Sequence, residues 1–402
     1  MAHRYPAGPQ RLLRLLNGRA VLEAIDRAGQ PVTTTDLAGR IKLSRPTVAA
    51  AVSLLLERGV ISEVGPVTGR KGPAPALYQV NADCAFAIGV DVGHKRIRAA
   101  VVDVTGQVRA RAEQEGPPDR DALVARIVAM CADLAGQVGL PLKDVTQVVM
   151  GLPAVVGADG RTLSYAAGLP EAGRGLGEAL GQGVPVPLVL ENDVNLAALA
   201  ERTHGRGTEV DDFVLVSLGV GLGLGMVVDG RVRRGATGVA GEAGYLPSDR
   251  MIAPPGQRRD LVQEHLGARY ISTEARRLGL PGDGSPRTVF DLARGGDPGA
   301  ARIVDDTARS IAYVVACVVP LIDPALIVLG GAIGGNGDLL LEPVARHLAD
   351  FSTFEPRIVA SGLGQDAVLM GATTMSSELA RESTFAAATA PSAPVEVPLS
   401  LS

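Results

Sequence analysis

Leu190-Glu191-Asn192-Asp193-Val194-Asn195 is the stretch of sequence that decides the fold. The apolar residues 186–190 predict a β-strand that ends at these polar side chains, and residues 196–202 predict the helix that follows. This order is typical of parallel α/β sheets, which keep their ligand crevice at the carboxyl ends of the strands. Asn192 can donate and accept hydrogen bonds at once, and Asp193 can accept a hydroxyl hydrogen, so the pair suits a polyol. The alternative interpretation is that these side chains only cap the next helix.

Size and composition indicate an α/β protein of two or three domains. The chain has 402 residues and is 46% hydrophobic, which is enough for more than one core. Its 50 glycines show no collagen-like period, so a fibrous protein is excluded. The longest apolar run, residues 311–322, is too short to cross a bilayer, and the N-terminus lacks the pattern of a signal peptide. We therefore expect a cytoplasmic protein with no membrane partner.

Positive charge is concentrated in the N-terminal fifth of the chain. Residues 1–80 contain 11 Lys or Arg and 5 acidic residues, whereas the rest of the chain contains 28 basic and 38 acidic residues. The N-terminal segment is therefore the candidate for contact with a polyanion.

The same segment has the pattern of a helix-turn-helix. Three helices are predicted, over residues 12–28, 34–41 and 45–58. Thr33 and Asp36 have the spacing of a capping box at the start of the second helix. Ser44 is placed to cap the third helix, which opens with Arg45 and Thr47. Two helices joined by a short turn can place the exposed first residues of the second helix against base edges in the major groove.

A basic loop follows the three helices. Predicted strands at residues 60–64 and 76–80 flank the loop at residues 69–73, which contains Arg70 and Lys71. Cationic side chains on a narrow glycine-proline loop suit a minor groove or a phosphate backbone, as in the wing of a winged helix-turn-helix. The alternative is a three-helix protein-interaction module with a solvated basic face. The helix spacing, the loop and the charge together favour binding of double-stranded DNA.

The rest of the chain predicts two α/β domains and a tail. Strands at residues 85–92 and 213–218 each lead into a glycine-marked hairpin, which suggests a weak internal duplication. Pro153 lies in a tight loop after another buried strand, predicted at residues 145–150. The expected division is a DNA-binding domain at residues 1–80, a smaller α/β domain at 81–195 completed by a helix near 367–383, a larger α/β domain at 196–366, and a disordered tail at 384–402.

Four motifs together resemble the ROK family, which combines sugar kinases with sugar-responsive repressors. They are Glu191 to Asn195 (family pattern E-N-D-x-N), the glycine-rich Gly219 to Gly225, Gly241 to Tyr245 (near G-E-x-G-H) and Gly330-Gly331. The resemblance implies an actin-like ATPase fold, of the ribonuclease H-like kind, in which two α/β domains close over a sugar. It also implies that Asn192, Asp193 and Glu242 hold sugar hydroxyls, with Asp193 at the position of the kinase general base.

Departures from the family pattern argue against kinase activity. A family kinase has D-x-G-G-T in its first phosphate loop, but here Asp91-Val92-Gly93 is followed by His94 and Lys95. In the second loop, Val220 stands at the threonine position. Phosphoryl transfer depends on positioning and charge stabilisation, so loops that cannot hold phosphates remove most of the rate. We therefore expect no enzymatic activity and no cofactor.

The zinc site of the family is also missing from the sequence. Tyr245 replaces its histidine, Pro255, Gln257 and Val262 fall at its cysteine positions, and the only cysteines, Cys84, Cys131 and Cys317, are widely separated. We therefore expect no bound metal. The same spacing places Glu264 at the closing glutamate, a sugar ligand in the family, although an exposed helix glutamate fits equally well. Tyr245 either replaces one hydrogen bond of the histidine to a sugar or packs beneath its loop.

The resulting prediction is a sugar-responsive repressor that binds a palindromic operator as a homodimer. The predicted effector site consists of Pro153, Asn192, Asp193, Glu242, Tyr245 and Glu264, and the predicted DNA-contacting residues are Ser44, Arg45, Thr47, Arg70 and Lys71. One alternative is an active ATP-dependent sugar kinase that also carries a DNA-binding head. Another is a corepressor-type protein whose head binds other proteins. Hydroxyl ligands alone do not identify the sugar.

Overall fold

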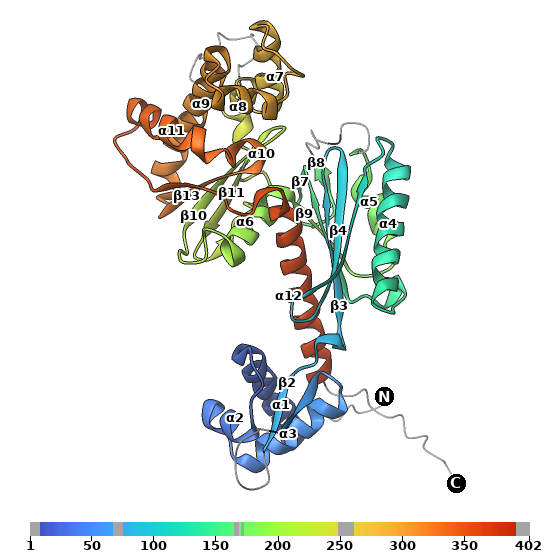
Figure 1. Cartoon of the computed structure of the whole chain (residues 1–402). Helices are drawn as coiled ribbons and strands as arrows, with labels where there is room; N and C mark the ends of the chain where they lie inside the picture. The colour runs from blue at the N-terminus through green and yellow to red at the C-terminus, as the bar shows by residue number, and fades with distance from the viewer. Residues whose placement is uncertain (1–8, 67–74, 165–168, 170–172, 248–260, 391–402) are drawn as a thin grey trace, which may run out of the picture.

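The computed structural model describes residues 9–66, 75–164, 169, 173–247 and 261–390. It consists of a small N-terminal head and two α/β lobes, and one long helix joins the head to the lobes (Figure 1). Within these ranges, no helix is long and apolar enough to cross a membrane.

The head contains three helices and a two-stranded sheet. Its elements are α1 (Pro9–Ala28), α2 (Thr34–Ile41), α3 (Arg45–Glu57), β1 (Ile61–Pro66) and β2 (Ala76–Val80). Thr33 and Asp36 form a reciprocal capping box at the start of α2, as the sequence predicted. Leu22, Leu37 and Leu55, one from each helix, are fully buried together. The three predicted helices and the hairpin are confirmed. The predicted basic loop with Arg70 and Lys71 lies outside the described residues.

The first lobe is built on a five-stranded sheet in the order β5-β4-β3-β6-β9. Its strands are β3 (Phe86–Val92), β4 (Arg96–Asp103), β5 (Val108–Glu115), β6 (Gln147–Leu152) and β9 (Leu188–Asn192). The first three form an antiparallel meander, while β6 and β9 run parallel to β3. Helices α4 (Arg120–Gln137) and α5 (Leu176–Gly183) cover one face, and α12 (Ala367–Thr389) covers the other (Figure 1).

The second lobe repeats this topology in the order β12-β11-β10-β13-β14. Its strands are β10 (Phe213–Leu218), β11 (Leu222–Val228), β12 (Arg231–Val232), β13 (Leu326–Gly330) and β14 (Ile358–Ala360). One face packs against helices α7 (Ala268–Arg277), α8 (Pro286–Arg294), α9 (Pro298–Ile322) and α11 (Gly337–Phe351). The shared strand order agrees with the predicted internal duplication.

Short elements complete the lobes. They are η1 (Ala82–Cys84), η2 (Leu142–Asp144), β7 (Val155–Val156), β8 (Leu163–Ser164), η3 (Ala243–Tyr245), η4 (Val262–Glu264), α10 (Gly331–Gly334) and η5 (Gly364–Asp366). Helix α6 (Asp193–His204) follows β9 directly and packs against α12 and against strands of both sheets. Residues 262–264 form a single 3₁₀ turn, so Glu264 does not lie on a regular helix. Helices α5, α7 and α8 were not predicted.

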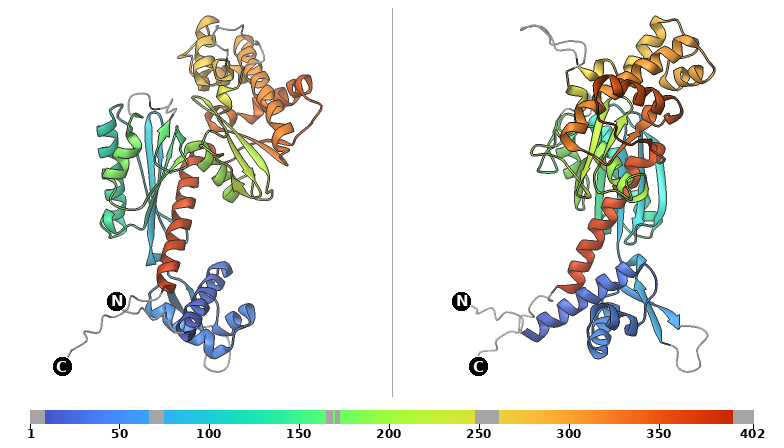
Figure 2. Two further views of the ribbon diagram at one scale, coloured as in Figure 1. Left: turned by 180° about the vertical axis from the view of Figure 1, so that it is seen from behind. Right: turned by 90° about the vertical axis from the view of Figure 1, so that its left-hand side faces the viewer.

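The prediction of a disordered tail from residue 384 is wrong for residues 384–389. Helix α12 continues to Thr389, and Figure 2 shows it running from the lobes down to the head. Phe385 and Ala388 are 3% and 6% exposed and belong to the core of the head. Burial of this apolar face stabilises the last turns of a helix whose small, polar composition had suggested disorder. Residues 391–402 lie outside the described ranges.

Candidate functional site

A cleft of about 1230 Å³ lies between the two lobes. It is bordered by the ends of β6 and β9, by the β10–β11 hairpin, by η3 and η4, and by faces of α7 and α9. All six residues of the predicted effector site line it: Pro153, Asn192, Asp193, Glu242, Tyr245 and Glu264. Tertiary structure therefore brings together residues that are spread over more than a hundred positions of the sequence.

Asn192 is the N-cap of α6. Its Oδ1 accepts hydrogen bonds from the backbone N–H groups of Val194, at 2.9 Å, and Asn195, at 3.1 Å. Its Nδ2 donates to the carbonyl oxygen of Ala154 at 3.1 Å. The capping interpretation is thus correct for the amide oxygen, and both of its lone pairs are used. One N–H of the amide remains to donate to a ligand in the cleft.

Asp193 occupies the first turn of α6 and faces the cleft. Burial raises its pKa to about 7, and repulsion from the Asp91 and Glu242 carboxyl groups acts in the same direction. Burial also raises the pKa of Glu242. Near neutral pH, Asp193 therefore exchanges between an acceptor and a donor of hydrogen bonds, which is a useful property next to sugar hydroxyls.

Tyr245 and Glu264 lie at the side of the cleft formed by the second lobe. Tyr245 is 42% exposed, which disagrees with the interpretation that it packs beneath its loop. Glu264 ends the 3₁₀ turn η4; it is exposed and lines the cleft. Val262, at a cysteine position of the family motif, is 3% exposed in the core. In the ranges that the structure covers, no three His, Cys, Asp or Glu side chains are placed to hold a metal ion. Pro255 and Gln257 lie outside those ranges.

Two arginines beside the cleft were missed by sequence reasoning. Arg98, on β4, pairs with Asp91 at 2.5 Å, and the Asp91 residue is only 4% exposed. Arg234 pairs with the buried Glu191, also at 2.5 Å. A signal for Arg98 was present in the sequence, because it is a charged residue within the apolar strand pattern of residues 97–102. Arg234 gave no comparable signal, since it stands among other polar loop residues.

The predicted DNA-contacting residues that the structure describes lie at the start of α3. Ser44 accepts a hydrogen bond from the Thr47 N–H at 3.3 Å, and the two hydroxyl groups are 2.8 Å apart. Ser44 and Arg45 are exposed, and Thr47 is half-buried. These positions are accessible to a partner from outside the head.

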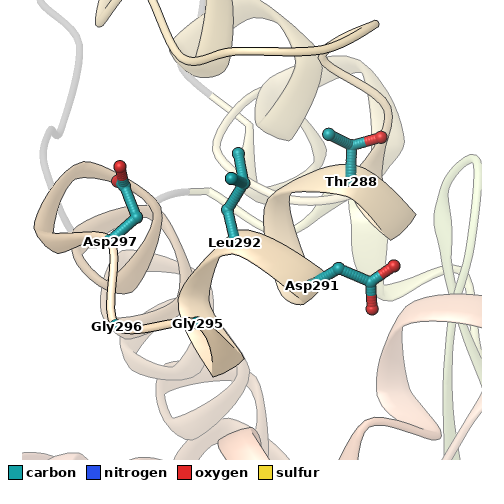
Figure 3. A pocket seen from close by; sticks show the side chains of 6 residues that line it. All are labelled: Thr288, Asp291, Leu292, Gly295, Gly296 and Asp297. Atoms are coloured by element: carbon teal, nitrogen blue, oxygen red, sulfur yellow. The ribbon is translucent and has the colours of Figure 1, made fainter.

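A second pocket, of about 560 Å³, lies beside α8 (Figure 3). It contains none of the predicted site residues, and its polar side chains already have partners. Asp297 caps α9 through the Ala300 N–H at 2.8 Å, and Asp291 pairs with Arg294 at 3.1 Å. This pocket is therefore not the candidate site.

Two family models match the sequence. The model described as the ROK family covers residues 87–378, and the model described as winged helix-turn-helix DNA-binding covers residues 15–62. The xylose repressor of Caldicellulosiruptor bescii is 24% identical over 396 residues, which cover 92% of this chain and 97% of that protein.

Solved structures show the same fold. The crystal structure of a ROK family transcriptional regulator, a homolog of the E. coli MLC protein, superposes with a TM-score of 0.73 at 23% identity, covering 94% of this chain and 99% of that one. A ROK family glucokinase from Streptomyces griseus, in complex with glucose and AMPPNP, gives a TM-score of 0.62 at 28% identity, covering 73% of this chain and 99% of that one. The match over residues 87–378 spans well over half of the sequence, so the chain belongs to the ROK family and carries a winged helix-turn-helix domain ahead of the ROK domain.

Proposed function

We propose that this protein is a cytoplasmic, sugar-responsive transcriptional repressor that binds a palindromic operator as a homodimer. Residues 1–80 form the DNA-binding head, and the cleft between residues 81–195 and 196–366 takes a monosaccharide or a sugar derivative. The likeness to the xylose repressor over 92% of this chain supports this proposal. The observation that carries it is helix α12, which contacts the first lobe, α6 and the head.

Helix α12 is tied to the protein at both ends. Asp366, at its N-terminus, pairs with Arg111 at 2.6 Å and with Arg98 at 3.3 Å. Along the first sheet, Gly89 lies so close to α12 that a Cβ there would approach the Thr373 N to 2.5 Å. At the other end, Phe385 is buried in the head. These contacts join the head to the first lobe through α12, so a change in lobe arrangement changes the position of the head relative to the second lobe.

Sugar binding controls operator affinity by shifting the populations of two lobe arrangements. The effector must bind one lobe arrangement more tightly than another, because a ligand with equal affinity for both shifts nothing. A thermal-shift screen of monosaccharides and their phosphates identifies the effector, since a ligand of the folded state raises the melting temperature. Operator binding is then measured with each hit. The proposal fails if no stabilising sugar changes operator affinity, or if the head shows no salt-dependent affinity for DNA.

We predict that Arg45→Ala weakens binding to the operator. Arg45 is exposed at the start of α3, where a guanidinium can reach a guanine in the major groove. The loss should be about 1–3 kcal/mol for the operator and small for unrelated DNA. Lys71→Ala should instead weaken all DNA sequences alike, as expected for a phosphate contact. Fluorescence anisotropy with operator and scrambled duplexes measures both. Parent-like operator binding by both variants would contradict this placement.

The alternative function is that of an ATP-dependent sugar kinase with a DNA-binding head. The pKa of Asp193, about 7, favours it, because such a carboxyl suits a general base. Two observations argue against a kinase. Arg98 already forms an ion pair with the carboxylate of Asp91 in the first phosphate loop, and Val220 in the second loop has no hydroxyl group.

We predict that the protein does not turn over ATP with sugars. A coupled assay that detects ADP, run with each stabilising sugar, should stay at background, because the loops lack groups that hold and neutralise phosphates. Sustained turnover that disappears in Asp193→Asn would establish the kinase instead.

We predict that sugar affinity increases with pH around neutrality. A hydroxyl donates a stronger hydrogen bond to the ionised carboxylate of Asp193 than to the neutral acid, and the pKa of Asp193 is raised to about 7. Affinity should therefore rise as the pH passes through 7 and level off above it. The raised pKa also means that this carboxyl contributes less to folding stability as the pH rises from about 4 toward 7. Isothermal titration calorimetry with the sugar at pH values below and above 7 tests the predicted rise in affinity. The affinity of Asp193→Asn should not show this dependence on pH.

A further inference from the structure

An ion pair joins the two lobes at Glu191, the residue that precedes Asn192 and Asp193 in the chain. Arg234 follows β12 of the second lobe, and its Nε donates to Glu191, on β9 of the first lobe, at 2.5 Å. The Glu191 side chain is 4% exposed, whereas that of Arg234 is 50% exposed. Neither residue is among those that line the cleft.

Glu191 supports the residues that do face the cleft. Its Oε1 accepts hydrogen bonds from the backbone N–H of Asn192 and from the Nδ2 of Asn195, both at 2.9 Å. Its Oε2 accepts from Arg234. One buried carboxylate therefore fixes the turn at which β9 becomes α6, and its charge has a single cationic partner among the residues that the structure describes.

The segment after Arg234 is held against the first lobe by close backbone contact. Gly238 has φ +87°, and a Cβ at this position would lie 2.0 Å from the carbonyl oxygen of Val156 on β7. Only glycine permits this approach. Glu242 follows four residues later and faces the cleft. The ion pair between Arg234 and Glu191 and the close contact at Gly238 therefore hold the loop that carries Glu242 against the first lobe.

We propose that Arg234 is a positioning residue that sets effector affinity without touching the effector. It neutralises Glu191 from the opposite lobe, which keeps Asn192 and Asp193 aligned and Glu242 opposite them. Removing the guanidinium leaves a buried carboxylate without its cation, and this favours separation of the lobes, which exposes Glu191 to water. Separation of the lobes weakens the hydroxyl-binding geometry. This inference rests on the proposed sugar site.

The test compares two neighbouring arginines in the full-length protein. Arg234→Met removes the pair between lobes, while Arg233→Met removes a pair with Asp229 inside a hairpin of the second lobe, at 2.8 Å. Calorimetry with D-xylose and D-glucose should show Kd about 10-fold higher in Arg234→Met and unchanged in Arg233→Met. Arg234→Lys should recover part of the affinity, because it keeps the charge. Operator affinity without sugar should be that of the parent in Arg233→Met.

A double-mutant cycle makes the test independent of the sugar. In urea unfolding, the double variant Arg234→Met/Glu191→Gln should shift the midpoint by less than the sum of the shifts of the two single variants. The reason is that each single substitution already breaks the same ion pair. Additive shifts, or equal sugar affinity in Arg234→Met and Arg233→Met, would overturn the proposal. If the parent binds neither sugar but the cycle shows coupling, the ion pair is confirmed as a contact between the lobes. In that case its role in effector affinity is wrong, and so is the proposed response to these sugars.

Discussion

Asp193→Ala should abolish or severely weaken the sugar response while leaving operator binding without sugar unchanged. Asp193 lies at the junction of β9 and α6, and Glu242 faces the same cleft from the second lobe. Loss of a hydrogen bond to a charged group costs about 1.5–3 kcal/mol, or roughly 10- to 150-fold in Kd. The start of α3, where we propose contact with DNA, belongs to the head, so its surface is not altered. Operator binding titrated with and without the effector sugar measures both quantities.

Asp133→Ala is the matched control for this experiment. Asp133 is exposed on α4 and does not line the cleft. Its replacement should change neither the sugar response nor operator affinity. If Asp193→Ala behaves like Asp133→Ala, the effector site lies elsewhere, and the function assigned to the stretch from Leu190 to Asn195 is wrong.

Phe385→Ala should uncouple the head from the lobes. Phe385 is 3% exposed and lies in the same core as Leu22 and Leu55, so the change leaves a cavity at the junction of α12 with the head. Truncation of a buried Phe typically costs about 3–5 kcal/mol. We expect a head that unfolds at lower urea concentration and an operator affinity that no longer responds to sugar. Sugar binding itself, measured by calorimetry, should remain close to that of the parent because the cleft is unchanged.

Phe354→Ala is the control for the α12 experiment. Phe354 is 57% exposed in the second lobe, so its removal should affect neither stability nor the response. An intact sugar response in Phe385→Ala, in spite of a head that unfolds at lower urea concentration, would show that α12 does not transmit the signal.

Local rules predicted much of the fold from the sequence. Apolar periodicity placed the three helices of the head, and Thr33 and Ser44 marked two of their starts, because a capping side chain bonds to backbone within three residues of itself. The strand that ends at Asn192 was predicted from its apolar residues, at 186–190, and the structure places it at residues 188–192. Helices α5, α7 and α8 were missed. They are short, and their stability depends on burying a few apolar residues such as Ile271 against the second sheet.

The sequence by itself determined which polar groups are available at the candidate site, and tertiary structure decided what those groups contact. The sequence pointed to Asn192 and Asp193 because the end of a strand is a local feature, and to Glu242 because its motif resembles the ROK family pattern. The pairing of Arg234 with Glu191 joins residues 43 positions apart, and that of Arg98 with Asp366 joins residues 268 apart. The burial of Phe385 in the head likewise requires the C-terminal helix to return to the beginning of the chain. Such contacts depend on the packing of whole sheets and helices, and no sequence period or motif encodes their separation.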